Sequence, residues 1–554
     1  MERKYVFVTG GVLSSVGKGS VAASIGKCLQ TRGYSVASIK IDPYLNYDSG
    51  LMNPFVHGEV FVSEDGGETD LDLGRYERFL GQVVLEDQNI TTGQVYYEVI
   101  KREREGKYLG KCVQIIPHVT DEIKRRIRII AERNNVEVTI TEIGGTVGDI
   151  EGMPFYEAAR QMRLEEGYTN TLFVHVALVP FLEATEEYKT KPLQHSVQEL
   201  RRIGIQPDIV VARARGAFSE EAREKIALFS NVPKDFVFVA RDLPTVYQLP
   251  LILEEQGLGN LVCKRLGMNN NNPNWSEWRN IVNSLLNFRD SVNIALVGKY
   301  VKLADSYISV IEALSLSGAK LGVKVNISYV EAENLNRENL DAYFKNIHGI
   351  LVPGGYGSRG AEGKILAIAY ARTRNLPLLG ICFGFQLATV EFCRNVLNMH
   401  EANTTEIDPS TQYPVISLSG EQVNVSRLGD TQRLGALPVY LKSDTLIRRL
   451  YGQDVIYERH RHRYEVNKIY LKNIEKAGMV ASALSGDGRV EAFEIPSHYY
   501  YLTVQYHPEF KSWPGRPDPA FLGFVKAAFD KKEGKVNFEA PTVDYDYPAS
   551  RLLR

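Results

Sequence analysis

The chain has 554 residues, a net charge of −2 and five cysteines. A single hydrophobic core stops growing near roughly 250–300 residues, so this length predicts at least two large domains. The near-neutral charge argues against bulk attraction to nucleic acid or to an anionic membrane. The cysteines are odd in number, scattered and without a Cys-x-x-Cys pair, which predicts neither a zinc site nor a disulfide framework. No signal peptide opens the sequence and no apolar run is long enough to span a membrane, so we expect a cytoplasmic protein.

Short apolar strand candidates alternate with helical patterns through the first half of the chain. This alternation predicts an α/β domain with a doubly wound parallel sheet of the P-loop type. We expect its strands at 4–9, 35–41, 136–142, 171–178, 208–213 and 235–240.

A second alternation begins near residue 292, after an asparagine-rich break at 267–275 that is typical of a linker. It predicts a second doubly wound α/β domain, with helices near 306–321, 363–374 and 383–396. Its strands are expected near 292–298, 325–330, 349–353, 377–381, 414–418 and 502–506. The expected organisation is a domain over 1–266, a linker over 267–291 with a helix at 276–286, a domain over 292–532, and a surface tail over 533–554.

A glycine-rich turn between the first strand and a helix is typical of a phosphate site. It runs from Thr9 to Gly19 and contains Lys18. Backbone N–H groups and the helix N-terminus would surround an anion, and Lys18 can reach the β- and γ-phosphates. The pattern departs from the usual P-loop because it is one residue longer and Gly19 replaces the metal-holding hydroxyl. A magnesium ion must therefore find carboxylates elsewhere.

Two acidic segments, 64–72 and 141–151, are candidates for that magnesium site. Glu142 ends a β-rich run, and carboxylates at strand ends face the ligand crevice of an open α/β sheet. A solvated turn is the alternative for each acid. The loop 189–195 packs two lysines beside hydrogen-bonding side chains, which suits a second phosphate group, with a solvated basic loop as the alternative.

A second catalytic signature lies near residue 382. The run Gly380-x-Cys382-x-Gly384 is typical of a nucleophile elbow, in which small residues permit the strained turn that exposes a thiol. The N–H of Phe383 and the glycine-rich run 353–357 can face a developing oxyanion. His507 and Glu509, two residues apart, would share one face of a strand and complete a triad. The cationic run 458–463 shows no metal-ligand pattern and is more typical of carboxylate or phosphate binding.

Several long runs occur in order along the chain: GGVLSSVGKG, HGEVFVSEDGGETDLDLGRYERF, EIGGTVGDIE, KTKPLQHSV, VPGGYGSRG, LGICFGFQ, ERHRHRYEVN and QYHPEF. In these runs the sequence resembles the CTP synthase family over about residues 1–530. The resemblance implies a P-loop amidoligase domain fused to a class I glutamine amidotransferase domain. It further implies ATP-dependent amination of UTP to CTP with ammonia from glutamine, through UTP phosphorylated at O4.

The resemblance implies roles for matching residues at the nucleotide end. ATP would be bound by Ser15, Val16, Gly17, Lys18, Gly19, Ser20, Lys40, Asp72, Arg241, Asp242 and Leu243. Magnesium would be held by Asp72 and Glu142. The triphosphate shared by UTP and CTP would be bound by Ser14, Lys189, Thr190, Lys191, Pro192, Leu193, Gln194 and Lys225. Inhibitory CTP would face Asp149, Ile150 and Glu151.

At the amide end, the resemblance implies Cys382, His507 and Glu509 as the catalytic residues. Glutamine would be bound by Gly355, Phe383, Gly384, Phe385, Gln386, Glu406 and Arg463, and His57 and Leu109 would lie along an ammonia passage. GTP is the implied activator, and a homotetramer with a tendency to form filaments is the implied assembly. Two departures from the family pattern are Leu193, where Thr is common, and Asp430, where Gly is common near the loop expected to respond to GTP.

Three other interpretations stay open on the sequence. A cobyrinate-type amidotransferase also joins an ATP domain to a glutaminase, although the uracil-site runs count against it. A dimerising ATP switch of the partitioning type would have no use for Cys382, His507 and Glu509. Filament assembly could be an added role.

Overall fold

The computed structural model describes residues 2–418 and 432–541, which form two compact units. Unit 1 comprises Met1–Ser49 and Asp72–Leu286, and unit 2 comprises Gly50–Leu71 and Asn287–Arg554. These bounds differ from the expected ones in two places. Helix α11 (Ser276–Leu286), expected in the linker, joins unit 1, where Trp278 is buried and its Nε1 donates to the Tyr247 carbonyl at 2.9 Å. Residues 50–71 join unit 2.

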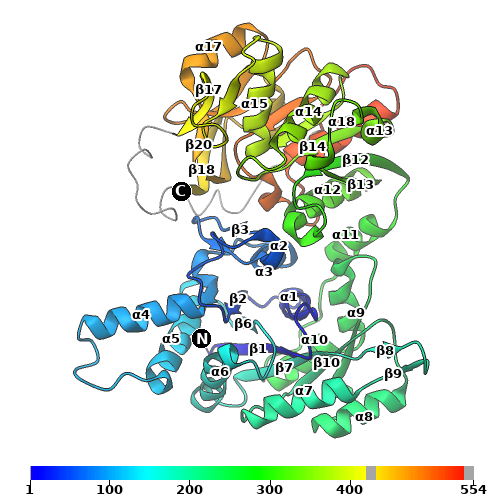
Figure 1. The fold of residues 1–554 in the computed structure, drawn as a ribbon. Helices are drawn as coiled ribbons and strands as arrows, with labels where there is room; N and C mark the ends of the chain where they lie inside the picture. Colours follow the sequence, from blue (N-terminus) through cyan, green and yellow to red (C-terminus); the bar gives the residue numbers. More distant parts are fainter. Residues whose placement is uncertain (1, 419–431, 542–554) are drawn as a thin grey trace. The chain divides into compact units, whose positions relative to one another are not determined.

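Unit 1 is built on a seven-stranded parallel sheet in the order β11-β10-β7-β1-β6-β2-β5 (Figure 1). The six expected strands are confirmed, and only the three-residue β5 was missed. The strands are β1 (Lys4–Gly11), β2 (Val36–Asp42), β5 (Asn89–Thr91), β6 (Val138–Ile143), β7 (Thr171–Leu178), β10 (Ile209–Ala214) and β11 (Val237–Arg241).

Helices cover both faces of this sheet. Tyr5 and Phe7 of β1 pack in one cluster with apolar residues of α5 and α6. On the other face α1 lies so close to the sheet that a Cβ on Gly26 would be 3.3 Å from Ile140 Cδ1. The helices are α1 (Lys18–Gln30), α3 (Leu71–Leu80), α4 (Thr92–Arg104), α5 (Thr120–Arg133), α6 (Met153–Glu166), α7 (Lys191–Arg202), α8 (Glu220–Ser230), α9 (Leu249–Glu255) and α10 (Leu258–Arg265).

Unit 2 contains a nine-stranded mixed sheet in the order β13-β12-β14-β15-β23-β22-β21-β18-β19. Its first five strands are parallel, and the remaining pairs are antiparallel. The strands are β12 (Asp290–Gly298), β13 (Val323–Glu331), β14 (Gly349–Val352), β15 (Leu378–Ile381), β18 (Arg433–Leu441), β19 (Val455–His462), β21 (Val480–Ser485), β22 (Val490–Glu494) and β23 (Tyr501–Val504).

The expected parallel strands of unit 2 are present, whereas the antiparallel extension was not expected. The segment expected as a strand at 414–418 lies in a separate small sheet with β16 and β20. Two apolar clusters cover the faces of the large sheet, one with α12 and α18 and one with α14 and α15. The further elements are α2 (Pro54–His57), α12 (Ile308–Leu321), α13 (Leu340–Phe344), α14 (Ala361–Thr373), α15 (Phe383–Asn395), β16 (Ala402–Thr404), β17 (Tyr413–Leu418), α16 (Leu446–Tyr451), β20 (Tyr464–Val466), α17 (Lys468–Lys476) and α18 (Pro519–Lys532).

A short hairpin from early in the sequence belongs to unit 2. It consists of β3 (Phe61–Val62) and β4 (Glu68–Thr69), and it contacts β18 and β19. The Ala436 N–H donates to the Glu64 carbonyl at 2.9 Å, and the ring of Phe61 lies 5.1 Å from that of Phe510. Among the described residues, none of the helices combines the length and the hydropathy needed to span a membrane.

Candidate active sites

The nucleophile elbow expected at Cys382 is present in unit 2. Cys382 joins β15 to α15 with φ of 52° and ψ of −102°, a left-handed conformation that is strained for a residue with a side chain. Its N–H donates to the Val504 carbonyl at 2.8 Å. A Cβ on Gly384 would lie 2.1 Å from the Val352 carbonyl oxygen, so only glycine fits where the helix turns away. The elbow places the thiol at the start of α15 beside the N–H of Phe383.

His507 and Glu509 lie beside this thiol, although not on a strand. Strand β23 ends at Val504, and Glu509 lies on a 3₁₀ turn over Pro508–Lys511. The expected strand geometry is therefore wrong, and the turn instead brings Glu509 Oε1 to 2.7 Å from His507 Nδ1. A Cβ on Gly354 would lie 3.0 Å from His507 Cε1 and 3.6 Å from Cys382 Cβ, so one backbone segment flanks both side chains.

The electrostatics of His507 favour its imidazolium form. Burial opposes the charge, but the carboxylate of Glu509 and the thiolate of Cys382 outweigh it and raise the pKa of His507 to about 10. Its buried Nε2 has no hydrogen-bond partner among the described residues and is free to serve the thiol. A thiol, an imidazole and a carboxylate thus lie close together, which is the set of groups that a triad requires.

A pocket of about 560 Å³ opens onto this triad. Cys382, His507 and Glu509 line it together with Gly355 and Arg463, two of the expected glutamine-binding residues. The residues Gly50–Phe55, which precede the hairpin, line the same pocket.

The other expected glutamine-binding residues lie around the pocket in different ways. Glu406 accepts the Gly357 N–H at 2.6 Å, and burial raises its pKa. Gln386 is buried and donates to the Tyr464 carbonyl at 2.9 Å. The side chain of Phe385 packs in the core against Phe493, so it faces away from the pocket.

Two buried lysines that the sequence analysis missed hold the loop after β14. Lys364 Nζ donates to the Pro353 and Gly354 carbonyls at 2.8 and 3.3 Å, and Lys299 donates to the Tyr356 carbonyl. Burial lowers the pKa of Lys299 to about 8 and that of Lys364 well below its usual value. The sequence does contain one signal for Lys364, because a lysine within the apolar pattern of α14 indicates a buried charge that needs a partner.

The phosphate turn of unit 1 ends as expected at the start of α1. Gly17 has φ of 94° at the N-cap, a conformation that favours glycine. Lys18 is buried, and its Nζ donates to the Gly145 carbonyl at 2.8 Å. Burial lowers the pKa of Lys18, while Glu142 opposes that shift. Val16 is buried in this turn, and Ser14 and Ser15 are exposed.

The two expected magnesium ligands, Asp72 and Glu142, converge beside Gly19. A Cβ on Gly19 would lie 2.9 Å from Asp72 Oδ1 and 3.1 Å from Glu142 Oε2. Burial and the nearby Asp72 raise the pKa of Glu142, which accepts a hydrogen bond from Tyr76. Lys40 Nζ lies 2.9 Å from Asp72 Oδ2. Two convergent carboxylates beside a phosphate turn fit a magnesium ion.

The segment 241–243, which is expected to bind ATP, lies near the phosphate turn. Asp242 pairs with Arg213 at 2.5 Å, and Arg213 Cδ is 3.8 Å from where a Cβ on Gly17 would lie. Arg241 is exposed and Leu243 is half-buried beside that pair.

The residues expected to bind the UTP triphosphate are divided between surface and core. Lys225 is exposed and Lys189 is half-buried, while Gln194 is buried and donates to Thr190 Oγ1 at 3.0 Å. Lys191 and Pro192 form the first turn of α7. Leu193 is fully buried in an apolar cluster, so its departure from the family pattern affects the core rather than a ligand contact.

The loop expected to face inhibitory CTP is continuous with the backbone that binds Lys18. Asp149 Oδ2 accepts the Thr146 N–H at 3.0 Å, and Ile150 and Glu151 are exposed. Of the expected passage residues, Leu109 is exposed in unit 1 and His57 is exposed in unit 2. Asp430 lies outside the described residues.

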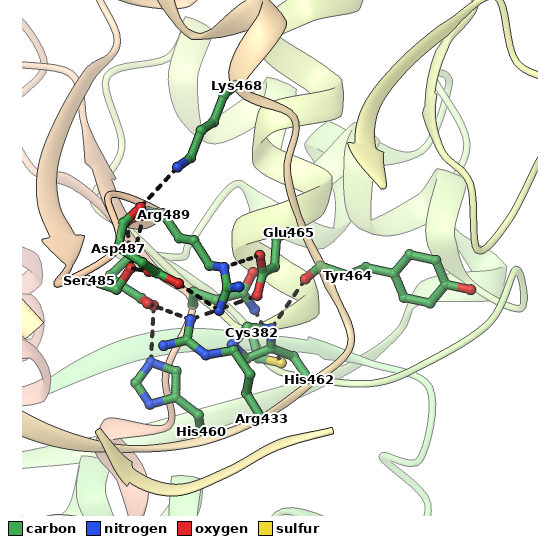
Figure 2. Close-up of polar contacts among 12 residues, drawn as sticks. Cys382, Arg433, His460, His462, Tyr464, Glu465, Lys468, Ser485, Asp487 and Arg489 are labelled. Carbon is green, nitrogen blue, oxygen red and sulfur yellow. Dashed lines mark hydrogen bonds and ion pairs between the residues drawn. The ribbon is translucent and has the colours of Figure 1, made fainter. Parts of the chain in front are cut away.

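A buried charge network surrounds the cationic run that follows Tyr457 (Figure 2). Glu491 accepts from His460 Nε2 at 3.0 Å and from Arg433 Nη1 at 2.8 Å. Burial opposes the charge of Glu491, but His460 and Arg433 lower its pKa to about 2. His460, His462 and Glu491 offer metal-type ligand atoms within 4.8 Å of one another. Because Arg433 already neutralises the carboxylate, the arrangement favours an ion-pair network that anchors β19.

Comparison with known proteins gives matches that extend over both units. The model of the CTP synthase N-terminus matches residues 4–268, and that of class I glutamine amidotransferases matches residues 302–527. The chain is 55% identical over 533 residues to the CTP synthase of Thermococcus kodakarensis, covering 96% of this chain and 99% of that protein. It is 56% identical over 531 residues to the CTP synthase of Saccharolobus solfataricus, covering 95% and 99%. It is 53% identical over 537 residues to a CTP synthase of Thermus thermophilus, covering 96% and 98%. With matches of this length across both units, the chain belongs to the CTP synthase family and is a glutamine-dependent CTP synthase.

Proposed function

We propose that unit 2 frees ammonia from glutamine through Cys382, His507 and Glu509. The thiolate of Cys382 attacks the amide carbon of glutamine, and the N–H of Phe383 stabilises the oxyanion. The imidazolium of His507 gives its Nε2 proton to the departing ammonia, and Glu509 holds the imidazole through Nδ1. Water then hydrolyses the thioester and releases glutamate. The observation that carries this proposal is that Cys382, His507 and Glu509 lie together and line one pocket.

Unit 1 uses ATP to activate UTP. Transfer of the γ-phosphoryl group to O4 of the uracil turns a poor leaving oxygen into phosphate, and ammonia then displaces it at C4. Lys18 and the N-terminus of α1 bind phosphate oxygens, which offsets the charge that develops during transfer. Asp72 and Glu142 would hold a magnesium ion, which supplies charge neutralisation when bound.

Regulation and organisation extend the same proposal. The exposed loop of Asp149, Ile150 and Glu151 would bind the cytosine edge of inhibitory CTP, while Lys189 to Gln194 and Lys225 bind the triphosphate common to CTP and UTP. GTP would act as an activator. A homotetramer in the cytoplasm, with an amidoligase domain followed by a glutaminase domain, completes the proposal.

Isotope transfer tests the two half-reactions together. The enzyme is supplied with ATP, magnesium, glutamine labelled with ¹⁵N in its amide, and UTP labelled with ¹⁸O at O4. We expect ¹⁵N in the 4-amino group of CTP and ¹⁸O in the released phosphate. If ¹⁸O appeared in water instead of phosphate, activation through O4 phosphorylation would be excluded. Omitting GTP or magnesium in parallel reactions tests the activator and the metal.

A further inference from the structure

The hairpin of β3 and β4 binds two arginines of β19 through buried carboxylates. Glu64 Oε2 lies 2.9 Å from Arg459 Nε, and the Val62 carbonyl accepts from Arg459 Nη1 at 3.0 Å. Glu68 Oε1 lies 2.6 Å from Arg461 Nε. The side chains of Arg459 and Glu64 are only 0% and 3% exposed. The cationic run thus binds carboxylates, as its composition predicts, but these carboxylates belong to the same chain.

The backbone carbonyls of these same two arginines contact the triad. The carbonyl of Arg459 accepts the His507 N–H at 2.8 Å, and that of Arg461 accepts from Cys382 Sγ at 3.6 Å. Each arginine therefore joins one hairpin glutamate, through its side chain, to one catalytic residue, through its backbone. In addition, the guanidinium of Arg461 lies 5.3 Å from the ring centre of Tyr356, a residue lining the pocket.

The alternate side chains of β19 are fixed on the opposite face of the strand. Successive residues of a strand point to opposite faces, so His460 and His462 point away from the hairpin. His460 bonds to Glu491. His462 Nδ1 bonds to the Tyr464 carbonyl at 3.2 Å (Figure 2). On the hairpin side, Arg459 and Arg461 depend on carboxylates that lie almost 400 residues earlier in the sequence.

We propose that Glu64 and Glu68 are positioning residues for amide hydrolysis. They fix β19 against the triad, so that Cys382 and His507 reach their working geometry only with the hairpin in place. Both glutamates act through the arginines and touch no reacting atom. The proposal rests on the catalytic role of Cys382 and His507 proposed above. Small displacements of reacting groups are costly, since about 1 Å can lower a rate by roughly 10²-fold.

Amide variants in the full-length enzyme test this. Glu68→Gln and Glu64→Gln keep the side-chain volume and remove the charge that holds each arginine. We expect each variant to lower kcat/KM for glutamine hydrolysis by roughly 10- to 100-fold. CTP formation from added ammonia should be unchanged. Glu68→Asp, which keeps the charge, should restore part of the loss.

A matched control comes from Glu494, another buried carboxylate of unit 2. It accepts the N–H groups of Leu446 at 2.9 Å and of Ile447 at 3.3 Å, and it does not line the pocket. Glu494→Gln should leave unchanged the ratio of the CTP formation rate with glutamine to the rate with added ammonia.

The alkylation rate of Cys382 by iodoacetamide gives a readout of thiol positioning that a purely structural role would not change. The exposed Cys112 is first replaced by Ser. We expect slower alkylation in Glu68→Gln but not in Glu494→Gln.

Two results would overturn the positioning role. One is a folded Glu68→Gln enzyme that hydrolyses glutamine at the wild-type rate. The other is a Glu68→Gln enzyme whose rate of CTP formation falls equally with glutamine and with added ammonia. Cys382→Ala, assayed in parallel, separates this from the proposed function: if that variant still hydrolysed glutamine, the triad assignment itself would be wrong.

Discussion

The amide site of unit 2 and the phosphate site of unit 1 differ in how far they are organised without ligands. In unit 2, the three side chains of Cys382, His507 and Glu509 are buried. The backbone N–H groups of Cys382 and His507 donate to carbonyls, and His507 bonds to Glu509. In unit 1, Lys18 and Glu142 are buried, whereas Lys225 and Glu151 are exposed. The comparison teaches that attack on an amide needs a fixed geometry, while a triphosphate brings charge that can order exposed side chains on binding.

The largest expected effect is the loss of the fixed nucleophile. Cys382→Ala should lower glutamine-dependent CTP formation by roughly 10⁴-fold or more, because no other group can form the thioester. CTP formation from saturating ammonia should be largely retained. Steady-state assays with the two nitrogen sources check this. Equal failure with ammonia in a folded variant would contradict the separation of the two sites.

Lys18→Ala should slow CTP formation equally with glutamine and with added ammonia, since activation of UTP precedes amination. The loss of one buried phosphate-binding charge should cost roughly 10²- to 10³-fold in kcat. Lys27→Ala is a matched control, because Lys27 lies on the same helix and packs over Trp278 away from the turn. A Lys18→Ala enzyme with normal turnover on ammonia would refute the phosphate role.

A pH profile sharpens the comparison at the amide site. The carboxylate of Glu509 helps to raise the pKa of His507 to about 10, so the imidazolium persists to alkaline pH. Glu509→Gln removes that charge and should lower the pKa, which moves the basic limb of kcat/KM for glutamine hydrolysis down by about one pH unit or more. The rate at neutral pH should also fall, because the imidazole loses its orienting partner. An unmoved basic limb would mean that His507 is not the group that loses its proton there.

The smallest expected effect concerns the exposed loop of Asp149, Ile150 and Glu151, which we propose to bind inhibitory CTP. Glu151→Lys should raise the CTP concentration for half-inhibition by about tenfold, the effect of one charge-assisted hydrogen bond. Turnover at saturating UTP should be mostly kept, since Glu151 is exposed. CTP titrations of wild type, Glu151→Lys and the exposed control Glu105→Lys measure this. Superimposable curves would remove the loop from the inhibitory site.

The sequence predicted central parallel strands such as β1 and β7 because they are buried almost throughout and are mostly apolar. Strand β19 escaped prediction because its sequence, Val455 to His462, is mostly polar or charged. Its stability depends on partners such as Glu64 and Glu491, which local patterns cannot reveal. For the same reason, the sequence located Cys382 and His507 but not Lys364, whose role depends on carbonyls it meets only in the folded unit.

Residues 50–71 belong to unit 2 although they lie in sequence between the two segments of unit 1. This arrangement determines what happens when the gene is split into two fragments. A cut after Leu286 would follow the apparent boundary in sequence, yet it would leave Gly50–Leu71 with the first fragment. The second fragment would lack one wall of its own pocket and would expose the apolar face of Phe510 that Phe61 covers. The two fragments would then be complementary parts rather than independent proteins, and recovery of glutamine hydrolysis on mixing them would report reinsertion of the missing piece.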